Sequence, residues 1–216
     1  DAYAAESVRR AQRASKEGDF VAEIAPVTIK SRKGEQVVAT DETPFQLDID
    51  KIPTLKPAFG KDGTVTAASS SSISDGAAAI VLMSESAAKA AGVKPLARLV
   101  SYASHAQAPE WFTTAPAPSM QKALDRAGWK VADVDLFEIN EAFACVAMAA
   151  MQDLGLRHDQ LNVNGGACAM GHPVGATGAR IITTLLHALR KRGLRRGVAS
   201  QCIGGGEACA VAVELL

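Results

Sequence analysis

The chain has 216 residues, of which 48% are hydrophobic, and its 23 lysines and arginines are balanced by 23 aspartates and glutamates. This length and apolar content suffice to bury a large core in one or two domains. Zero net charge favours neither nucleic acid nor an anionic membrane, and no apolar run approaches the roughly 20 residues that span a bilayer, so we expect neither as a partner.

The first 62 residues predict a helix, a strand pair and a loop. Alanines and Val8 recur at helical spacing amid arginines over the first 14 residues, which is typical of an amphipathic helix that must pack on something. Residues 24–29 and 36–39 alternate about a Lys33-Gly34 turn and predict a hairpin. Residues 41–57 carry three prolines and few periodic apolar positions, which favours a loop.

Residues 63–93 predict strands around a serine-rich loop. Residues 64–68 suit a short strand, and the serines that follow lead into the apolar run 77–83, which suits a buried strand. From Pro95 onward strands and helices alternate, which predicts a layered α/β domain. The expected strands are 96–102, 136–139, 197–202 and 209–215, and the expected helices are 117–127, 142–154 and 179–189, the first two ended by glycine.

Three motifs carry the chemistry. One histidine and one cysteine each stand in a glycine-rich turn, where backbone N–H groups can approach a ligand closely and a reactive side chain is not buried in packing. The histidine motif is NGGACAMGHPVGATGAR at 164–180, the cysteine motif is QCIGGG at 201–206, and NEAFA at 140–144 is the third.

In this order and at these separations the motifs resemble the thiolase family over the whole chain. The resemblance implies the thiolase-like layered αβαβα fold, with this chain as the C-terminal half plus part of the loop domain. Residues 1–62 would belong to the loop domain that covers the substrate, 63–93 would complete the absent N-terminal domain, and 94–216 would form the C-terminal domain. The family's nucleophilic cysteine would lie outside this chain, because none of its four cysteines has a matching context.

Thiolases join or cleave carbon–carbon bonds between acyl groups carried as coenzyme A thioesters. The resemblance therefore implies acyl-CoA as substrate, no tightly bound cofactor, the N-terminal half of the thiolase as partner, and a homodimer or homotetramer. We expect a cytoplasmic protein, with any targeting segment on the part of the thiolase outside this chain. Acetyl-CoA and acetoacetyl-CoA are the expected substrates, since bulky Trp111 and Phe112 stand where many relatives are smaller or more flexible.

Four residues are the expected catalytic groups. The imidazole of His172 titrates near neutrality and suits the general base that activates the nucleophile and then donates to a thioester oxygen. By resemblance Cys202 exchanges the proton alpha to the thioester, which requires donors that lower its pKa. Asn140, at a strand end, would share the first oxyanion site with His172, and the backbone N–H of Gly204 would serve the second.

Further positions are expected to contact coenzyme A or the acyl group. Ser71 matches the family serine that contacts the pantetheine arm, and Phe143 and Phe112 would line the pocket, although Phe143 fits a core position equally well. Many thiolases carry an arginine near Phe45 that meets the nucleotide, and this chain has none there. Glu141 suits a helix N-terminus as well as a catalytic role.

Other interpretations stay open. Cys168, His172, Cys202 and Cys209 could converge on zinc, but their spacings are not those of structural zinc sites, so we expect no metal. The basic residues at 190–196 are expected to close a helix rather than bind RNA or phosphate. A ketoacyl synthase would use a second histidine or an asparagine in place of Cys202. An inactive coenzyme A-binding or assembly subunit is the non-enzyme alternative.

Overall fold

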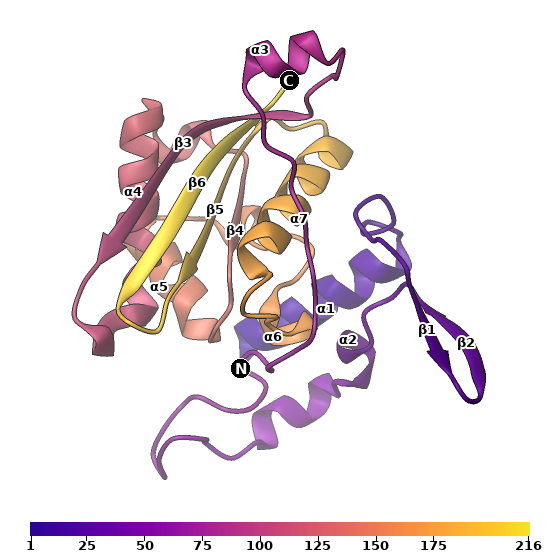
Figure 1. The fold of residues 1–216 in the computed structure, drawn as a ribbon. Coiled ribbons are helices and arrows are strands. Elements are labelled where there is room, and N and C mark those ends of the chain that lie inside the picture. The colour runs from indigo at the N-terminus through magenta and orange to yellow at the C-terminus, as the bar shows by residue number, and fades with distance from the viewer.

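The computed structural model describes all 216 residues, and its centre is a four-stranded sheet (Figure 1). The strands are β3 (Ala97–Ala106), β4 (Leu136–Ile139), β5 (Arg196–Cys202) and β6 (Glu207–Leu215), in the order β3-β6-β5-β4. Only β4 and β5 run parallel. All four predicted strands are confirmed, and β3 extends four residues beyond its predicted end.

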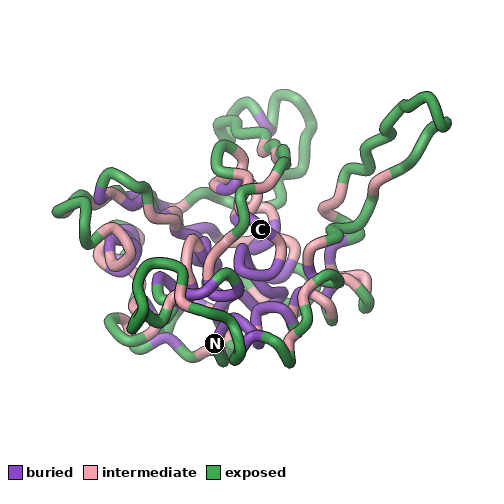
Figure 2. Tube along the Cα trace, turned by 90° about the horizontal axis from the view of Figure 1, so that it is seen from below, coloured by how far each residue is buried: buried purple, intermediate pink, exposed green.

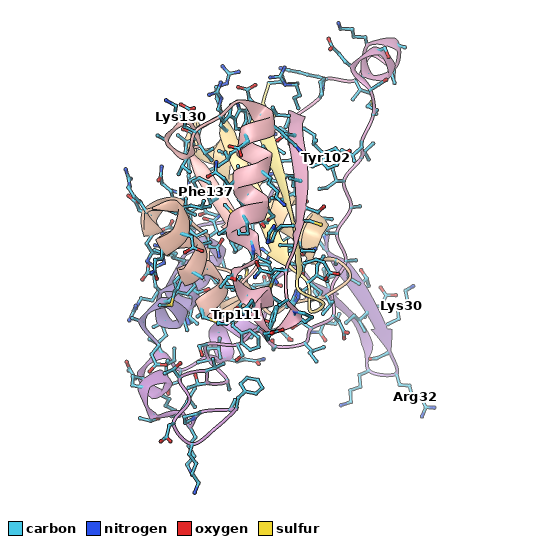
Figure 3. The ribbon with its side chains drawn as sticks, turned by 90° about the vertical axis from the view of Figure 1, so that its left-hand side faces the viewer. Lys30, Arg32, Tyr102, Trp111, Lys130 and Phe137 are labelled. Carbon is cyan, nitrogen blue, oxygen red and sulfur yellow. The ribbon has the colours of Figure 1, made fainter.

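Helices cover both faces of this sheet. Helices α4 (Pro116–Ala127) and α5 (Ala144–Leu154) cover one face of the sheet and enclose the main core against it. Phe137 is buried in this core (Figure 3). Helix α7 (Thr177–Arg192) buries Ile181, Leu185 and Leu189 against the other face. The three predicted helices are confirmed, and each ends at a glycine in the left-handed conformation that glycine adopts without strain.

The predicted opening helix is confirmed as α1 (Ala2–Lys16). Its apolar side packs within the chain, because Val8 and Ala11 contact Ala169 of α6 (Ala167–Met170). This contact supplies the packing partner that the amphipathic pattern requires. The hairpin of β1 (Val27–Ser31) and β2 (Gly34–Val38) is also confirmed and projects from the body, and every residue of the two strands except Val38 is exposed (Figure 2).

The stretch predicted as a loop at 41–57 contains two short helical segments. Helix α2 (Thr43–Gln46) has Pro44 in its first turn, where the missing N–H costs nothing. The 3₁₀ helix η1 (Ile49–Thr54) is capped by the Asp48 carboxylate, which accepts the N–H of Asp50. Three more 3₁₀ turns, η2 (Pro109–Thr114), η3 (Val131–Asp133) and η4 (His158–Gln160), connect the larger elements.

The two strands predicted between residues 64 and 83 are wrong. The Ser69 hydroxyl accepts the N–H of Thr66 at 2.8 Å and closes a turn where the first strand was expected. Residues 77–83 are extended but pair with no strand, and they run beside α7 toward the short helix α3 (Glu85–Ala90) (Figure 1). Val81 is 82% exposed. A strand needs a neighbour to receive its backbone hydrogen bonds, and this chain supplies none here.

No helix in the structure combines the length and the apolar character needed to cross a membrane.

Candidate active site

The parallel pairing of β4 and β5 brings two of the expected site residues to one edge of the sheet. Ile139 pairs with Ser200, and the next residue, Asn140, donates its backbone N–H to the Ser200 carbonyl at 2.9 Å. Cys202 ends β5 two residues later. Parallel strands end at the same edge, so the register places Asn140 and Cys202 there together.

His172 is held at the same edge by the serine-rich segment and by α7. Its backbone N–H donates to the Ser72 carbonyl at 2.9 Å. The preceding Gly171 has φ +88°, and a side chain there would collide with the Ser74 hydroxyl, so only glycine allows this approach. The ring places Nε2 at 3.4 Å from Asn140 Nδ2 and Nδ1 at 2.6 Å from the hydroxyl oxygen of Thr177.

The environment of His172 keeps the imidazole neutral. Burial, and then the positive charge of Arg180, lower the pKa of His172 below its ordinary value of 6.5. Both effects disfavour the imidazolium, so at neutral pH the ring carries one proton and one free lone pair. This is the state that a general base requires before it accepts a proton.

Cys202 differs from the sequence expectation. Burial raises the pKa of its thiol to about 11, and Cys145 adds to the rise. Donors that would lower the pKa were expected, but the backbone N–H of Cys202 itself is the one group that acts in that direction. In this chain Cys202 is therefore a protonated thiol at neutral pH.

The turn after Cys202 presents a free backbone donor. Ile203 donates its N–H to Glu207, and Gly206 donates to Ile203, which closes the turn. Gly204, between them, is exposed, and its N–H has no hydrogen-bond partner. A donor held in a closed turn and left unpaired is suited to bind an oxygen that develops negative charge.

The residues expected to contact coenzyme A gather beside the same motifs. The backbone N–H and the hydroxyl of Ser71 both donate to the carbonyl of Ala142, each at 3.1 Å. The half-buried ring of Phe143 lies edge-on to Phe59 at 6.0 Å and to Phe112 at 6.3 Å between centroids. The serine segment, the NEAFA motif and η2 thus meet at one place, and Phe59 is a member that the sequence did not indicate.

Two aromatic residues singled out in the sequence are less enclosed. Trp111, labelled in Figure 3, is 62% exposed on η2. Phe45 is on α2, and the ammonium group of Lys16 lies 5.9 Å from its ring centroid. A cation over the ring face is a favourable contact, so Phe45 is engaged by its own chain.

Glu141 is a structural anchor in this chain. Its fully buried carboxylate accepts hydrogen bonds from the Tyr3 hydroxyl at 2.9 Å and the Ser7 hydroxyl at 2.8 Å. It also accepts the Asn162 amide at 2.8 Å and the backbone N–H of Cys168 at 3.0 Å. Four donors satisfy a buried charge. Glu141 therefore joins α1, the NEAFA motif and the approach to His172.

Cys168, His105 and His158 are engaged by other parts of the fold. Burial raises the pKa of Cys168 far above its ordinary value, with Glu141 adding to the rise. His105 is bonded to Gln107 and Lys122, and His158 stacks on Tyr3. No group of three or more histidine, cysteine, aspartate or glutamate side chains is arranged to hold a metal ion.

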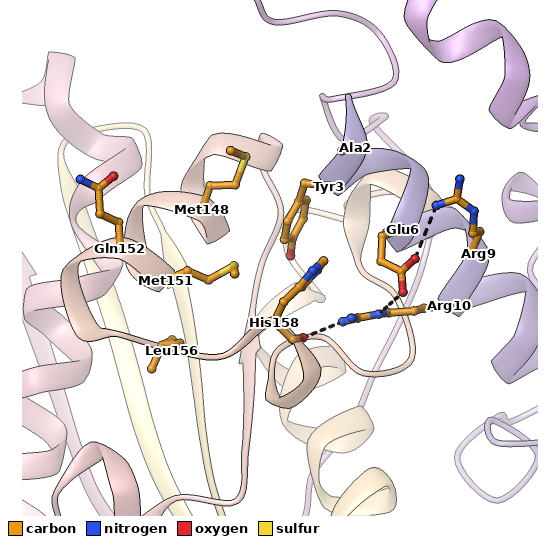
Figure 4. Close-up of a pocket in the computed structure, with 10 residues that line it drawn as sticks. All are labelled: Ala2, Tyr3, Glu6, Arg9, Arg10, Met148, Met151, Gln152, Leu156 and His158. Carbon is orange, nitrogen blue, oxygen red and sulfur yellow. Dashed lines mark hydrogen bonds and ion pairs between the residues drawn. The ribbon is translucent and has the colours of Figure 1, made fainter.

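A cavity of about 630 Å³ lies away from these motifs, between α1 and α5 (Figure 4). Met148 and Met151 line one side, and Glu6 and Arg10 form an ion pair on the other. Arg10 also donates to the His158 carbonyl at 3.0 Å. The polar side of the cavity is therefore occupied by residues that bond to other parts of the chain. The cavity contains none of the expected catalytic residues.

The fold and the three motifs define the class of protein, and comparison with known sequences agrees. Residues 1–86 match the family described as thiolase, N-terminal domain, and residues 93–215 match thiolase, C-terminal domain. The chain belongs to the thiolase family.

Among its relatives, the acetyl-CoA acetyltransferase of Shinella zoogloeoides is 49% identical, and the probable acetyl-CoA acetyltransferase of Dictyostelium discoideum is 51% identical, both over the full chain. The crystal structure of the Bacillus anthracis acetyl-CoA acetyltransferase superposes with a TM-score of 0.97 at 45% identity and 100% coverage of this chain. The Ascaris suum Acat5 thiolase, solved in complex with coenzyme A, gives 0.89 at 41%, again over the whole chain. The chain spans 55%, 52%, 55% and 55% of these four proteins, respectively.

Proposed function

We propose that this chain is the C-terminal part of a thiolase that catalyses reversible Claisen condensation and thiolysis of acyl-CoA, with acetyl-CoA and acetoacetyl-CoA as substrates. One observation carries the proposal: Asn140, His172 and the Cys202 turn lie at one sheet edge, with His172 Nε2 at 3.4 Å from Asn140 Nδ2. The acetyl-CoA acetyltransferases to which the chain is similar support the substrate class.

In the first half-reaction, the nucleophilic cysteine would come from the part of a thiolase that this chain does not span. Its thiol gives its proton to Nε2 of His172, and the thiolate attacks the thioester carbonyl. The imidazolium then donates to the oxyanion with Asn140, and its proton passes to the departing coenzyme A thiolate. The lowered pKa of His172 suits this cycle because the ring returns to its neutral state.

In the second half-reaction, Cys202 as a thiolate removes the alpha proton of a second acetyl-CoA. The carbanion attacks the acyl-cysteine carbonyl, whose oxygen is bound by the N–H of Gly204, and the tetrahedral intermediate collapses by breaking the bond to the cysteine sulfur. The released cysteine thiolate then takes the proton from the Cys202 thiol, which restores both groups. Because burial raises the pKa of Cys202 to about 11 in this chain, the complete site must supply a group that stabilises the thiolate. We propose that the N-terminal half of the thiolase supplies it.

The residues beside the three motifs would have binding roles. Ser71 would contact the pantetheine arm, and Phe143 and Phe112 would bound the acyl pocket. Residues 1–62 would cover the substrate, 63–93 would complete the N-terminal domain, and 94–216 would form the C-terminal domain. We propose a cytoplasmic homodimer or homotetramer with no tightly bound cofactor.

The test compares acetoacetyl-CoA thiolysis by the 216-residue chain alone with thiolysis after addition of a polypeptide that covers the N-terminal part of a related thiolase. We expect no turnover by the chain alone and turnover by the mixture. The matched control mixture carries Cys202→Ala and should be inactive, while Cys209→Ala should be active. Turnover by the chain alone would contradict the proposed origin of the nucleophile. A folded, inactive complex that binds coenzyme A would favour the coenzyme A-binding or assembly subunit instead.

A further inference from the structure

The side chain behind the His172 ring is Thr177, the first residue of α7. Thr177 is fully buried. Its hydroxyl oxygen lies 2.6 Å from Nδ1 of His172 and 3.0 Å from the backbone carbonyl oxygen of Pro173. Both partners are within hydrogen-bond distance, so the hydroxyl joins the ring to the start of the helix.

Counting protons assigns the direction of each bond. A threonine hydroxyl has one proton to donate and lone pairs to accept with, whereas the Pro173 carbonyl can only accept. In the structure the Thr177 hydroxyl donates its proton to the Pro173 carbonyl, and a lone pair faces Nδ1. A neutral imidazole carries one N–H, so that hydrogen is on Nδ1, and Nε2 holds the lone pair toward the N–H of Asn140 Nδ2 at 3.4 Å.

We propose that Thr177 is a positioning residue that fixes His172 in its Nδ1–H tautomer and so dedicates Nε2 to proton exchange with substrate and nucleophile. Only the catalytic consequence of this tautomer rests on the proposed function. The tautomer itself is a property of this chain. The bond from the backbone N–H of His172 to the Ser72 carbonyl fixes the main chain from which the ring projects.

The hydroxyl is also chemically suited to this role. A carboxylate behind Nδ1 would stabilise the imidazolium, whereas the uncharged Thr177 orients the ring without adding negative charge. The charged group that most affects the ring is Arg180, which disfavours a second proton. The pair thus holds a neutral base with a defined lone pair, and acyl transfer needs that state at its start.

The direct test is the tautomer of His172 in the 216-residue chain, measured by long-range ¹H–¹⁵N correlation after histidine labelling at about pH 8, where a free imidazole is neutral. A His172→Gln variant assigns the signals. We expect a protonated, pyrrole-type Nδ1 and an unprotonated, pyridine-type Nε2. The opposite pattern, or equal population of both tautomers, would overturn the proposal whether or not the chain supports thiolase chemistry.

Variants test the consequence. Thr177→Val keeps the volume but removes the acceptor, so we expect a mixture of tautomers and a fall in kcat for enzyme acylation of roughly 10- to 100-fold in the reconstituted enzyme, with KM unchanged. Thr177→Ser keeps the hydroxyl and should restore both the tautomer and kcat. A valine variant with the wild-type tautomer would refute the proposal. An inactive wild-type complex with the expected tautomer would refute the proposed function alone.

Discussion

The carboxyl group of Glu138 offers a test of the site's electrostatics that is independent of any substrate. Glu138 is on β4, two residues before Asn140, and is 1% exposed. Its nearest cation is Arg180 of α7, whose guanidinium nitrogen lies 4.0 Å from one carboxylate oxygen, and the other oxygen has no partner. Burial raises the pKa of Glu138 to about 8, and the neighbouring Glu141 and Glu23 add to the rise.

The direction and size of the effect on stability follow from this pKa. Between the ordinary value of 4.5 and about 8, the folded state keeps a proton on Glu138 that the unfolded state releases. The stabilisation is therefore fully present below pH 4.5 and is lost as the pH rises through about 8. At 1.36 kcal/mol per pKa unit the upper bound is about 5 kcal/mol. Structural relaxation and water entry around a buried charge reduce this, so we expect about 2–3 kcal/mol.

The assay is urea unfolding of the chain at about pH 5 and about pH 8.5, followed by circular dichroism. The wild type should lose free energy of unfolding at the higher pH, and Glu138→Gln, which has no proton to lose, should lose about 2–3 kcal/mol less. Glu23, with a pKa raised to about 7, leaves part of the pH dependence in the variant. The exposed Glu110→Gln is the control and should match the wild type. Equal pH dependence in Glu138→Gln and wild type would refute the reasoning.

Three further predictions concern the reconstituted enzyme. Cys202→Ala should abolish condensation while sparing acylation of the nucleophile, and His172→Ala should slow both half-reactions by roughly 10²- to 10⁴-fold, since one imidazole serves as base and donor. Single-turnover kinetics with Cys209→Ala and His187→Ala as controls separate the steps, and more than about a tenth of wild-type condensation in Cys202→Ala would contradict its role as base. Phe112→Ala should widen the acyl pocket and shift specificity toward longer 3-ketoacyl-CoA substrates by about 1–3 kcal/mol in kcat/KM. A ratio unchanged from wild type would remove Phe112 from the pocket.

The sequence predicted most of the C-terminal layers because their signals are local. Helices α4, α5 and α7 each show apolar spacing, and the first two were also expected to end at a glycine. Those features specify a helix wherever it packs. The run at 77–83 has an equally clear apolar signal, yet it forms no strand here. Strand formation depends on a partner, and the sequence of one strand cannot show whether its partner is present.

In the candidate site, too, features with a local sequence signal were predicted, and features that depend on contacts within the fold were not. We singled out His172 and Cys202 because glycine-rich turns mark them along the chain, and Asn140 because it opens the NEAFA motif after a predicted strand. Thr177 was not found, although it lies within the histidine motif, because a threonine in the first turn of a helix has an ordinary capping explanation. Only the 2.6 Å contact with Nδ1 gives it a second role. The raised pKa of Cys202 is likewise a property of burial that no local pattern records.

The buried network around Glu141 explains how distant segments produce one rigid site. Its carboxylate accepts hydrogen bonds from two hydroxyl groups in the first turns of α1. It also accepts a hydrogen bond from the backbone N–H of Cys168, four residues before His172. The backbone carbonyl of Ala142, the next residue, holds Ser71. A buried carboxylate is costly unless every donor stays in place, so movement of any one segment would leave a charge unsatisfied. The free-energy cost of an unsatisfied buried charge therefore holds α1, the NEAFA motif and the segment before His172 in one arrangement. The positions of His172 and Ser71 follow from that arrangement.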